Sequence, residues 1–217
     1  MSRLMRGCIP LTLMLAATGP GVARQSDLSL RITVRVYNYA KASTAILRLA
    51  ESEASRIFQS AGLETRWVDC LGVPAEDALP PCRGPLTPTD IILRILAERG
   101  STRRGFRDAH LGFALPSDKG GFHASIFYPD VESVAEKEGI PQDVLLGHGM
   151  AHEIGHLLLN SSAHFQFGLM RGKWDSKDLQ HAARGDLLFT AEQASYIRTE
   201  VLRRTGQSQV LSIHTLQ

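Results

Sequence analysis

Residues 28–68 run LSLRITVRVYNYAKASTAILRLAESEASRIFQSAGLETRWV, and this stretch sets the fold class. Apolar and polar residues alternate from Leu28 to Tyr37, which predicts a strand with one face in solvent. Between Ser43 and Ala61 the apolar residues fall on one helical stripe, and Gly62 follows as a C-terminal stop. Residues 63–68 predict a second strand. A strand, a helix and a strand in this order favour parallel pairing with a right-handed crossover.

Strand and helix patterns continue downstream. Three further strands are expected at residues 91–96, 111–115 and 122–128. Helices are expected at residues 129–137, at 142–159 and from Thr190 to Gly206, where Thr190 and Gln193 form a capping box. The chain is therefore predicted to have an α+β (mixed α/β) fold with a five-stranded sheet.

The composition is that of one globular domain, expected over residues 24–217. Of the 217 residues, 43% are hydrophobic and 21% are charged, which excludes an intrinsically disordered chain. No apolar run approaches the ~20 residues that a membrane-spanning helix needs. A multi-span transporter or channel is therefore excluded.

The N-terminal residues 1–23 predict a secretory signal peptide. Arg3 and Arg6 precede an apolar stretch, Cys8–Ala17, and Gly21-Val22-Ala23 offers small residues for cleavage. We therefore expect a secreted or periplasmic protein. Because the first strand begins within a few residues of the cleavage point, no inhibitory propeptide is expected on the N-terminal side.

The net charge of the chain argues against a nucleic-acid partner. Cleavage after residue 23 would remove Arg3 and Arg6 and leave 22 basic and 22 acidic side chains. Nucleic acid is a poor candidate partner for such a neutral chain.

The two remaining cysteines, Cys70 and Cys82, are expected to form a disulfide in an oxidising compartment. A metal-binding pair is the alternative, but such sites use a shorter C-x-x-C spacing.

The residues with catalytic potential concentrate in AHEIGHLLL, residues 151–159. His152 and His156 are four residues apart in an apolar helical pattern, so their imidazoles project from one face and can bind one metal ion. Glu153 can reach a metal-bound water, and Zn(II) suits this ligand set. Asn160 is expected to end the helix, and a turn at residues 161–163 to bring back His164 as a third ligand.

These residues resemble the metzincin clan of zinc metalloproteases. That family has H-E-x-x-H on a long helix, then a turn, a third histidine and a 1,4-turn with a methionine under the metal. The matching residues are His152, Glu153, His156, His164 and Met170. The resemblance covers residues 28–204 and implies a twisted, mostly parallel five-stranded sheet that packs with a crossover helix, an active-site helix and a C-terminal helix.

The resemblance implies a secreted zinc-dependent endopeptidase with one catalytic zinc ion and a peptide or protein substrate. Zinc would lower the pKa of its bound water, and Glu153 would take the proton of that water and later give it to the leaving amine. Gly112, Phe113 and Ala114 resemble the edge strand on which such enzymes align an extended peptide. An edge strand without a ligand is the alternative.

The loop before the third histidine departs from the family pattern. Leu159 stands where the family has a glycine, and Ser162 stands where it has the third histidine. His164 follows two residues later. Asp175 and Asp178 are the alternative third ligands, because other zinc peptidases use a downstream acid.

Other interpretations remain for the neighbouring residues. Met170 is either the Met-turn residue or an ordinary core methionine. His148, on the same helix face, is expected to pack or support rather than to bind the metal, and His123 is expected to be an ordinary strand histidine. A non-catalytic binding module, with zinc or metal-free, is the alternative to an enzyme. Glu153 favours the enzyme, because a purely structural zinc site gains nothing from a carboxylate beside its ligands and prefers four protein ligands.

Overall fold

The structure is a computed structural model and describes residues 30–71, 80–98, 111–117 and 121–206. The predicted signal peptide, residues 1–23, lies outside these ranges. The strands are β1 Arg31–Asn38, β2 Glu64–Asp69, β3 Asp90–Leu96, β4 Gly112–Leu115 and β5 His123–Phe127. The helices are α1 Thr44–Ser60, α2 Pro80–Arg83, α3 Tyr128–Glu138, α4 Gln142–Leu158, α5 Ser176–Arg184 and α6 Ala191–Arg204.

The five strands form one sheet in the order β2-β1-β3-β5-β4. The strand β1 pairs in parallel with β2 and β3, so that Val34 faces Trp67 on one side and Ile91 on the other. The strand β3 pairs in parallel with β5, and β4 is antiparallel to β5. The predicted mostly parallel five-stranded sheet and the parallel β1-α1-β2 unit are confirmed. The strand β4 lies at one edge of the sheet.

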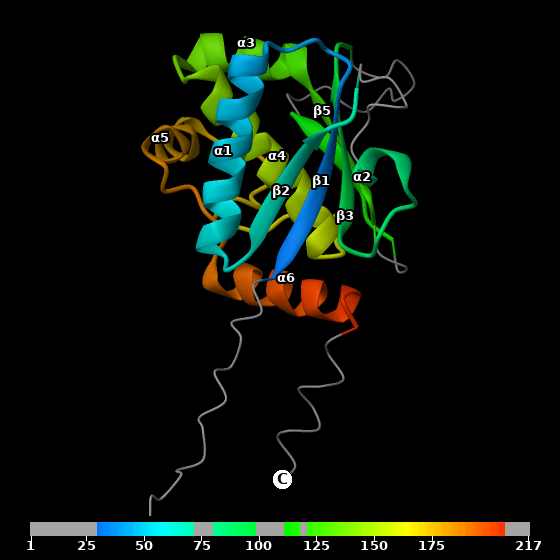
Figure 1. The fold of residues 1–217 in the computed structure, drawn as a ribbon. Coiled ribbons are helices and arrows are strands. Elements are labelled where there is room, and N and C mark those ends of the chain that lie inside the picture. Colours follow the sequence, from blue (N-terminus) through cyan, green and yellow to red (C-terminus); the bar gives the residue numbers. More distant parts are fainter. Residues whose placement is uncertain (1–29, 72–79, 99–110, 118–120, 207–217) are drawn as a thin grey trace, which may run out of the picture.

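The helix α4 lies near the centre of the molecule, packed beside α1 and against the sheet (Figure 1). Every residue from Leu145 to Leu158 is buried, and α1, α3, α5, α6, β4 and β5 all contact this helix. The buried apolar side chains of the sheet and helices form a single hydrophobic core. Such a helix is held rigidly by its neighbours, and this fixes the direction of its polar side chains.

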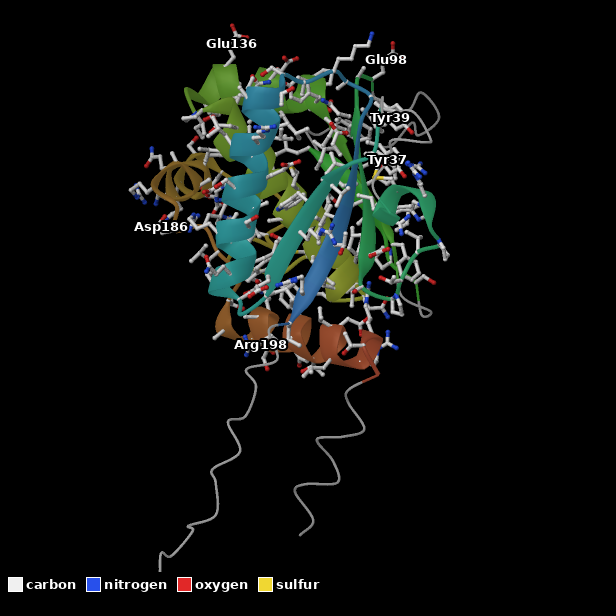
Figure 2. The ribbon with its side chains drawn as sticks, viewed as in Figure 1. Tyr37, Tyr39, Glu98, Glu136, Asp186 and Arg198 are labelled. Carbon is white, nitrogen blue, oxygen red and sulfur yellow. A yellow bond between two sulfur atoms is a disulfide. The ribbon has the colours of Figure 1, made fainter. Side chains whose placement is uncertain are left out.

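The C-terminal helix α6 crosses below the sheet in Figure 1. Its capping box was predicted correctly: the Thr190 hydroxyl accepts from the Gln193 N–H, and the Gln193 side chain accepts from the Thr190 N–H. Arg198, labelled in Figure 2, donates to the Ala61 carbonyl at 2.8 Å and so ties α6 to the end of α1. Buried Arg204 donates to the Leu157 carbonyl at 2.7 Å at the end of α4.

The predicted disulfide between Cys70 and Cys82 is present and joins the end of β2 to α2. The helices α2 and α5 were not predicted. An Asp175 side chain caps α5, in a capping box completed by Asp178. None of the described helices is both long and apolar enough to span a membrane.

Candidate metal centre

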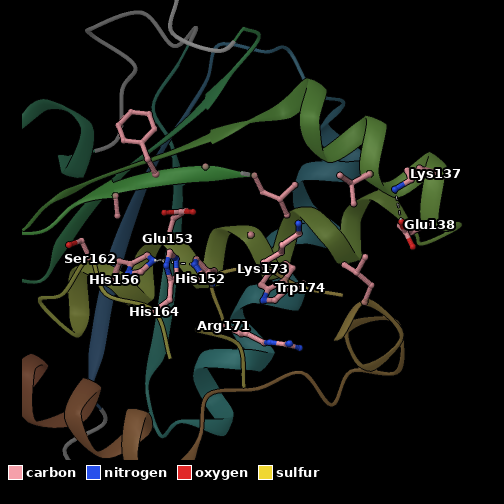
Figure 3. A pocket seen from close by; sticks show the side chains of 18 residues that line it. Lys137, Glu138, His152, Glu153, His156, Ser162, His164, Arg171, Lys173 and Trp174 are labelled. Carbon is pink, nitrogen blue, oxygen red and sulfur yellow. Dashed lines mark hydrogen bonds and ion pairs between the residues drawn. The ribbon is translucent and has the colours of Figure 1, made fainter. Parts of the chain in front are cut away.

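Three imidazoles converge at the C-terminal half of α4 (Figure 3). His152 and His156 lie one helical turn apart, and their Nε2 atoms are 3.1 Å from each other. His164 comes from the following loop, and its Nε2 lies 3.3 Å from that of His156. One ring nitrogen from each residue lies within 4.8 Å of the other two. Among the described residues, this is the one group of three or more potential metal ligands that meets in this way.

A sharp chain reversal after α4 brings His164 back. Asn160 has a φ of 48°, in the left-handed region that asparagine tolerates, as the sequence predicted. The Ser161 N–H then donates to the His156 carbonyl at 3.1 Å, which closes the reversal. The third imidazole therefore returns toward the helix within eight residues of His156.

Backbone carbonyls orient the two helix imidazoles. The Nδ1 of His152 lies 2.8 Å from the Leu169 carbonyl, and the Nδ1 of His156 lies 2.7 Å from the Ser161 carbonyl. A carbonyl oxygen only accepts, so each Nδ1 carries the proton and donates it. In the neutral ring, each Nε2 then presents its lone pair to the point where the three rings meet. Burial and the neighbouring His164 lower the pKa of His156, which favours the neutral, metal-binding form.

This arrangement fits a zinc ion. Nitrogen ligands about 2.0 Å from a tetrahedral zinc ion are about 3.3 Å from one another. The two Nε2 separations of 3.1 and 3.3 Å agree with that spacing. Two lone pairs that face each other at such distances repel unless a cation lies between them. The three histidines could therefore hold a divalent cation, and the cavity beside them is open to a further ligand.

Glu153 points from α4 into the space between the histidines and β4 (Figure 3). The residue is 7% exposed, and burial raises the pKa of its carboxyl to about 8. A divalent cation beside the carboxyl would favour the ionised form and oppose this shift. Glu153 is therefore a buried carboxyl beside the histidine cluster, with a pKa raised into the range in which it can both take up and release a proton.

Met170 lies in a tight turn that supports the ligands. The Arg171 N–H donates to the Gly168 carbonyl at 3.2 Å and closes a turn around Leu169 and Met170. The carbonyl of Leu169 is the one that orients His152. Met170 is fully buried, and a Cβ added to Gly155 would lie 2.6 Å from its sulfur. Met170 is thus both a core residue and a neighbour of the helical turn between the two histidines.

Gly172 lies close against the ring of His164, a contact that the sequence did not predict. A Cβ added to Gly172 would lie 2.7 Å from Cγ and 2.8 Å from Nδ1 of His164. The backbone of residue 172 therefore packs directly against the imidazole. An H-x(7)-G spacing carries no signal of its own, because only the path of the loop brings the two residues together.

The three histidines lie at a cavity of about 460 Å³ (Figure 3). One wall is β4, with Gly112, Phe113 and Ala114, the residues predicted for the substrate strand. The remaining lining comes from the residue before β4, from α3, α4 and α5, and from the loop after α4; it consists of Leu111, Val134, Lys137, Glu138, Gly149, His152, Glu153, His156, Ser162, His164, Arg171, Gly172, Lys173, Trp174 and Leu179. The sequence predicted the histidines at the floor of this cavity but not its walls in α3 and α5.

The alternative third ligands have other partners. The Asp175 carboxylate accepts from the N–H groups of Lys177 and Asp178 at the start of α5. The Asp178 carboxylate accepts from the Asp175 N–H and pairs with Arg171 at 2.5 Å. His164, and neither of these aspartates, lies with the two helix histidines.

The remaining histidines of the motif region lie outside the cluster. His148 is completely buried in α4, with its Nδ1 2.9 Å from the Val144 carbonyl and 3.7 Å from a Glu53 oxygen. His123 lies in β5, opposite Leu115 of β4. Both residues have the packing and strand positions that the sequence predicted.

Comparisons with known proteins leave the family open. No model of a known protein family matches the chain, and no curated protein matches its sequence. The function is therefore inferred from the geometry of the site.

Proposed function

We propose that the chain is a zinc-dependent endopeptidase of the metzincin type. The observation that carries this proposal is the convergence of three Nε2 atoms beside a buried carboxyl at the floor of an open cavity. A purely structural zinc site would use a fourth protein ligand. Among the described residues the cluster offers three histidines, and Glu153 lies next to them in the cavity lining.

His152, His156 and His164 would hold the zinc ion. When bound there, zinc supplies Lewis-acid chemistry: it polarises a carbonyl oxygen and lowers the pKa of a coordinated water. Glu153 takes the proton of the attacking water and delivers it to the nitrogen of the leaving amine. The residue is 7% exposed, which limits the contact of this carboxyl with bulk water.

The strand β4 is proposed to align the substrate. Its place at the edge of the sheet leaves one side without a neighbouring strand in the described sheet, and residues 112–114 line the cavity. An extended peptide can add to such an edge through main-chain hydrogen bonds. A peptide held there would pass over Glu153 and the three histidines, which supports hydrolysis of a peptide bond.

We propose that the protein works outside the cytoplasm, in the periplasm or the external medium. The disulfide between Cys70 and Cys82 supports this location, because such bonds persist in oxidising compartments.

The test is the substitution Glu153→Gln in the zinc-loaded protein. Glutamine keeps the size of the side chain but does not accept the proton, so cleavage of reduced, unfolded casein should fall by about 100-fold or more while zinc content stays unchanged. Activity that survives this substitution contradicts the hydrolase mechanism. Zinc retention without any cleavage by the unmodified protein favours the non-catalytic binding module instead.

A further inference from the structure

The cavity continues beyond the metal centre along α4. In Figure 3, Lys173 and Trp174 lie on one side of His152, toward Lys137 and Glu138, whereas Ser162 lies on the other side. The apolar side chains that line this part of the cavity are Leu111, Val134, Trp174 and Leu179, and the Trp174 ring lies edge-on to His152 with the ring centroids 5.5 Å apart. Trp174 is fixed there, because its Nε1 donates to the Leu169 carbonyl at 3.1 Å. This part of the cavity is thus an apolar space with a charged rim.

The rim carries three cations, and two of them have carboxylate partners. Arg171 pairs with Asp175 at 3.0 Å and with Asp178 at 2.5 Å. Lys137 pairs with Glu138 at 3.2 Å. Lys173 is exposed, and within the described ranges it makes no ion pair.

The anions of the lining do not neutralise Lys173. Glu138 already pairs with Lys137, and it also accepts from the Ser176 hydroxyl at 3.2 Å. Glu153 lies over the histidine cluster, next to Gly112 of β4 (Figure 3). A negatively charged side chain that enters the apolar space would therefore meet Lys173 as its available cationic partner.

We propose that Lys173 gives the cleft a preference for an acidic substrate side chain at one position beside the scissile bond. This inference rests on the proposed peptidase function and extends it to the substrate class. Glutamate suits the space best, because its methylene groups can pack on the apolar lining while its carboxylate reaches the rim. The preference should weaken at high salt, since Lys173 is exposed and its charge is screened.

The experiment uses a proteome-derived peptide library, digested with the zinc-loaded protein at low salt, with the cleavage sites mapped by mass spectrometry. The unmodified protein, Lys173→Glu and the control Lys177→Glu are compared. Lys177 is an exposed lysine of α5 that does not line the cavity, so both substitutions change the net charge equally. Thermal unfolding and zinc content verify that each variant is folded and loaded.

The unmodified protein and Lys177→Glu should show glutamate enriched at one flanking position by about 3- to 10-fold over glutamine. In Lys173→Glu the enrichment should disappear, and lysine or arginine should replace glutamate at the same position. Cleavage with identical preferences in all three proteins overturns this inference alone. An absence of cleavage by the unmodified protein overturns the proposed function, and this inference with it.

Discussion

Gly172 shapes the metal centre although it offers no ligand atom of its own. Its backbone packs on the His164 ring, and a Cβ at this position would lie 2.7 Å from Cγ of the imidazole. The substitution Gly172→Ala should therefore displace His164 and weaken zinc affinity by about 10- to 100-fold, the cost expected when the support of a ligand is lost. Competition with a chromophoric chelator measures this change.

Gly149→Ala is the matched control for Gly172→Ala. Gly149 also lines the cavity, but a Cβ at this position would have its nearest neighbours 3.7 Å away, which is ordinary contact. The control should keep the zinc affinity of the unmodified protein. If Gly172→Ala binds zinc as tightly as the unmodified protein, the loop adjusts freely and Gly172 does not position His164.

At the scale of single residues, the sequence predicted those parts of the site that depend on local geometry. His152 and His156 share a helix face by their spacing alone, and Asn160 carries the conformational preference that reverses the chain. The carbonyl of Leu169 that orients His152 comes from 17 residues away, and its position follows from the path of the loop. Contacts of this kind have no spacing signature, so sequence reasoning could not find them.

The attachment of α6 to α4 depends on Arg204. This side chain is 7% exposed, donates to the Leu157 carbonyl at 2.7 Å and pairs with Glu200 at 2.8 Å. The substitution Arg204→Ala would leave that carbonyl without this donor beside the ligand His156. It should lower the free energy of unfolding by about 3 kcal/mol, as measured by urea unfolding followed by circular dichroism.

Arg203→Ala serves as the comparison for Arg204→Ala. Arg203 pairs with the same Glu200 at 2.7 Å, but its side chain is 54% exposed. An exposed ion pair contributes less than about 1 kcal/mol, so this variant should be nearly as stable as the unmodified protein. A similar decrease in the free energy of unfolding of the two variants would contradict the role assigned to the buried hydrogen bonds of Arg204.

At the scale of elements, the spacing of apolar residues and the presence of helix-capping residues decided which strands and helices could be predicted. The alternation in β1 and the helical stripe of α1 identified the first two elements, and Thr190 with Gln193 marked the start of α6. The helix α5 was missed because its capping box ends in Asp178, whereas the sequence signature has glutamate or glutamine at that place. The helix is also only nine residues long, which leaves few turns over which a helical pattern of apolar residues can be detected.

In the molecule as a whole, the disulfide and the metal centre belong to different regions. Cys70 follows β2, and the strands β2 and β4 form opposite edges of the sheet. The bond spans 12 residues, and a loop of that size stabilises a fold by about 3 kcal/mol in the chain-entropy description. The double substitution Cys70→Ser and Cys82→Ser should lower stability by roughly this amount in urea unfolding. Zinc content should not change, and its loss would show that the two regions are coupled.

The order of the sheet brings the two halves of the proposed active site together. The parallel strands β3 and β5 pack against α4, and the antiparallel β4 forms the edge that borders the cavity. The loop after α4 closes the opposite wall with His164 and Trp174. A peptide-sized cleft over a three-histidine floor results from this topology, and the proposed activity depends on a metal ion bound at that floor.

Zinc content by elemental analysis of the purified protein tests that dependence most directly, with His164→Ala and Asp175→Ala measured beside the unmodified chain. The unmodified protein and Asp175→Ala should each retain about one zinc ion per chain after dialysis against a moderate chelator, whereas His164→Ala should lose most of it. Full zinc retention in His164→Ala, or no zinc affinity in the unmodified protein, would contradict the three-histidine metal centre.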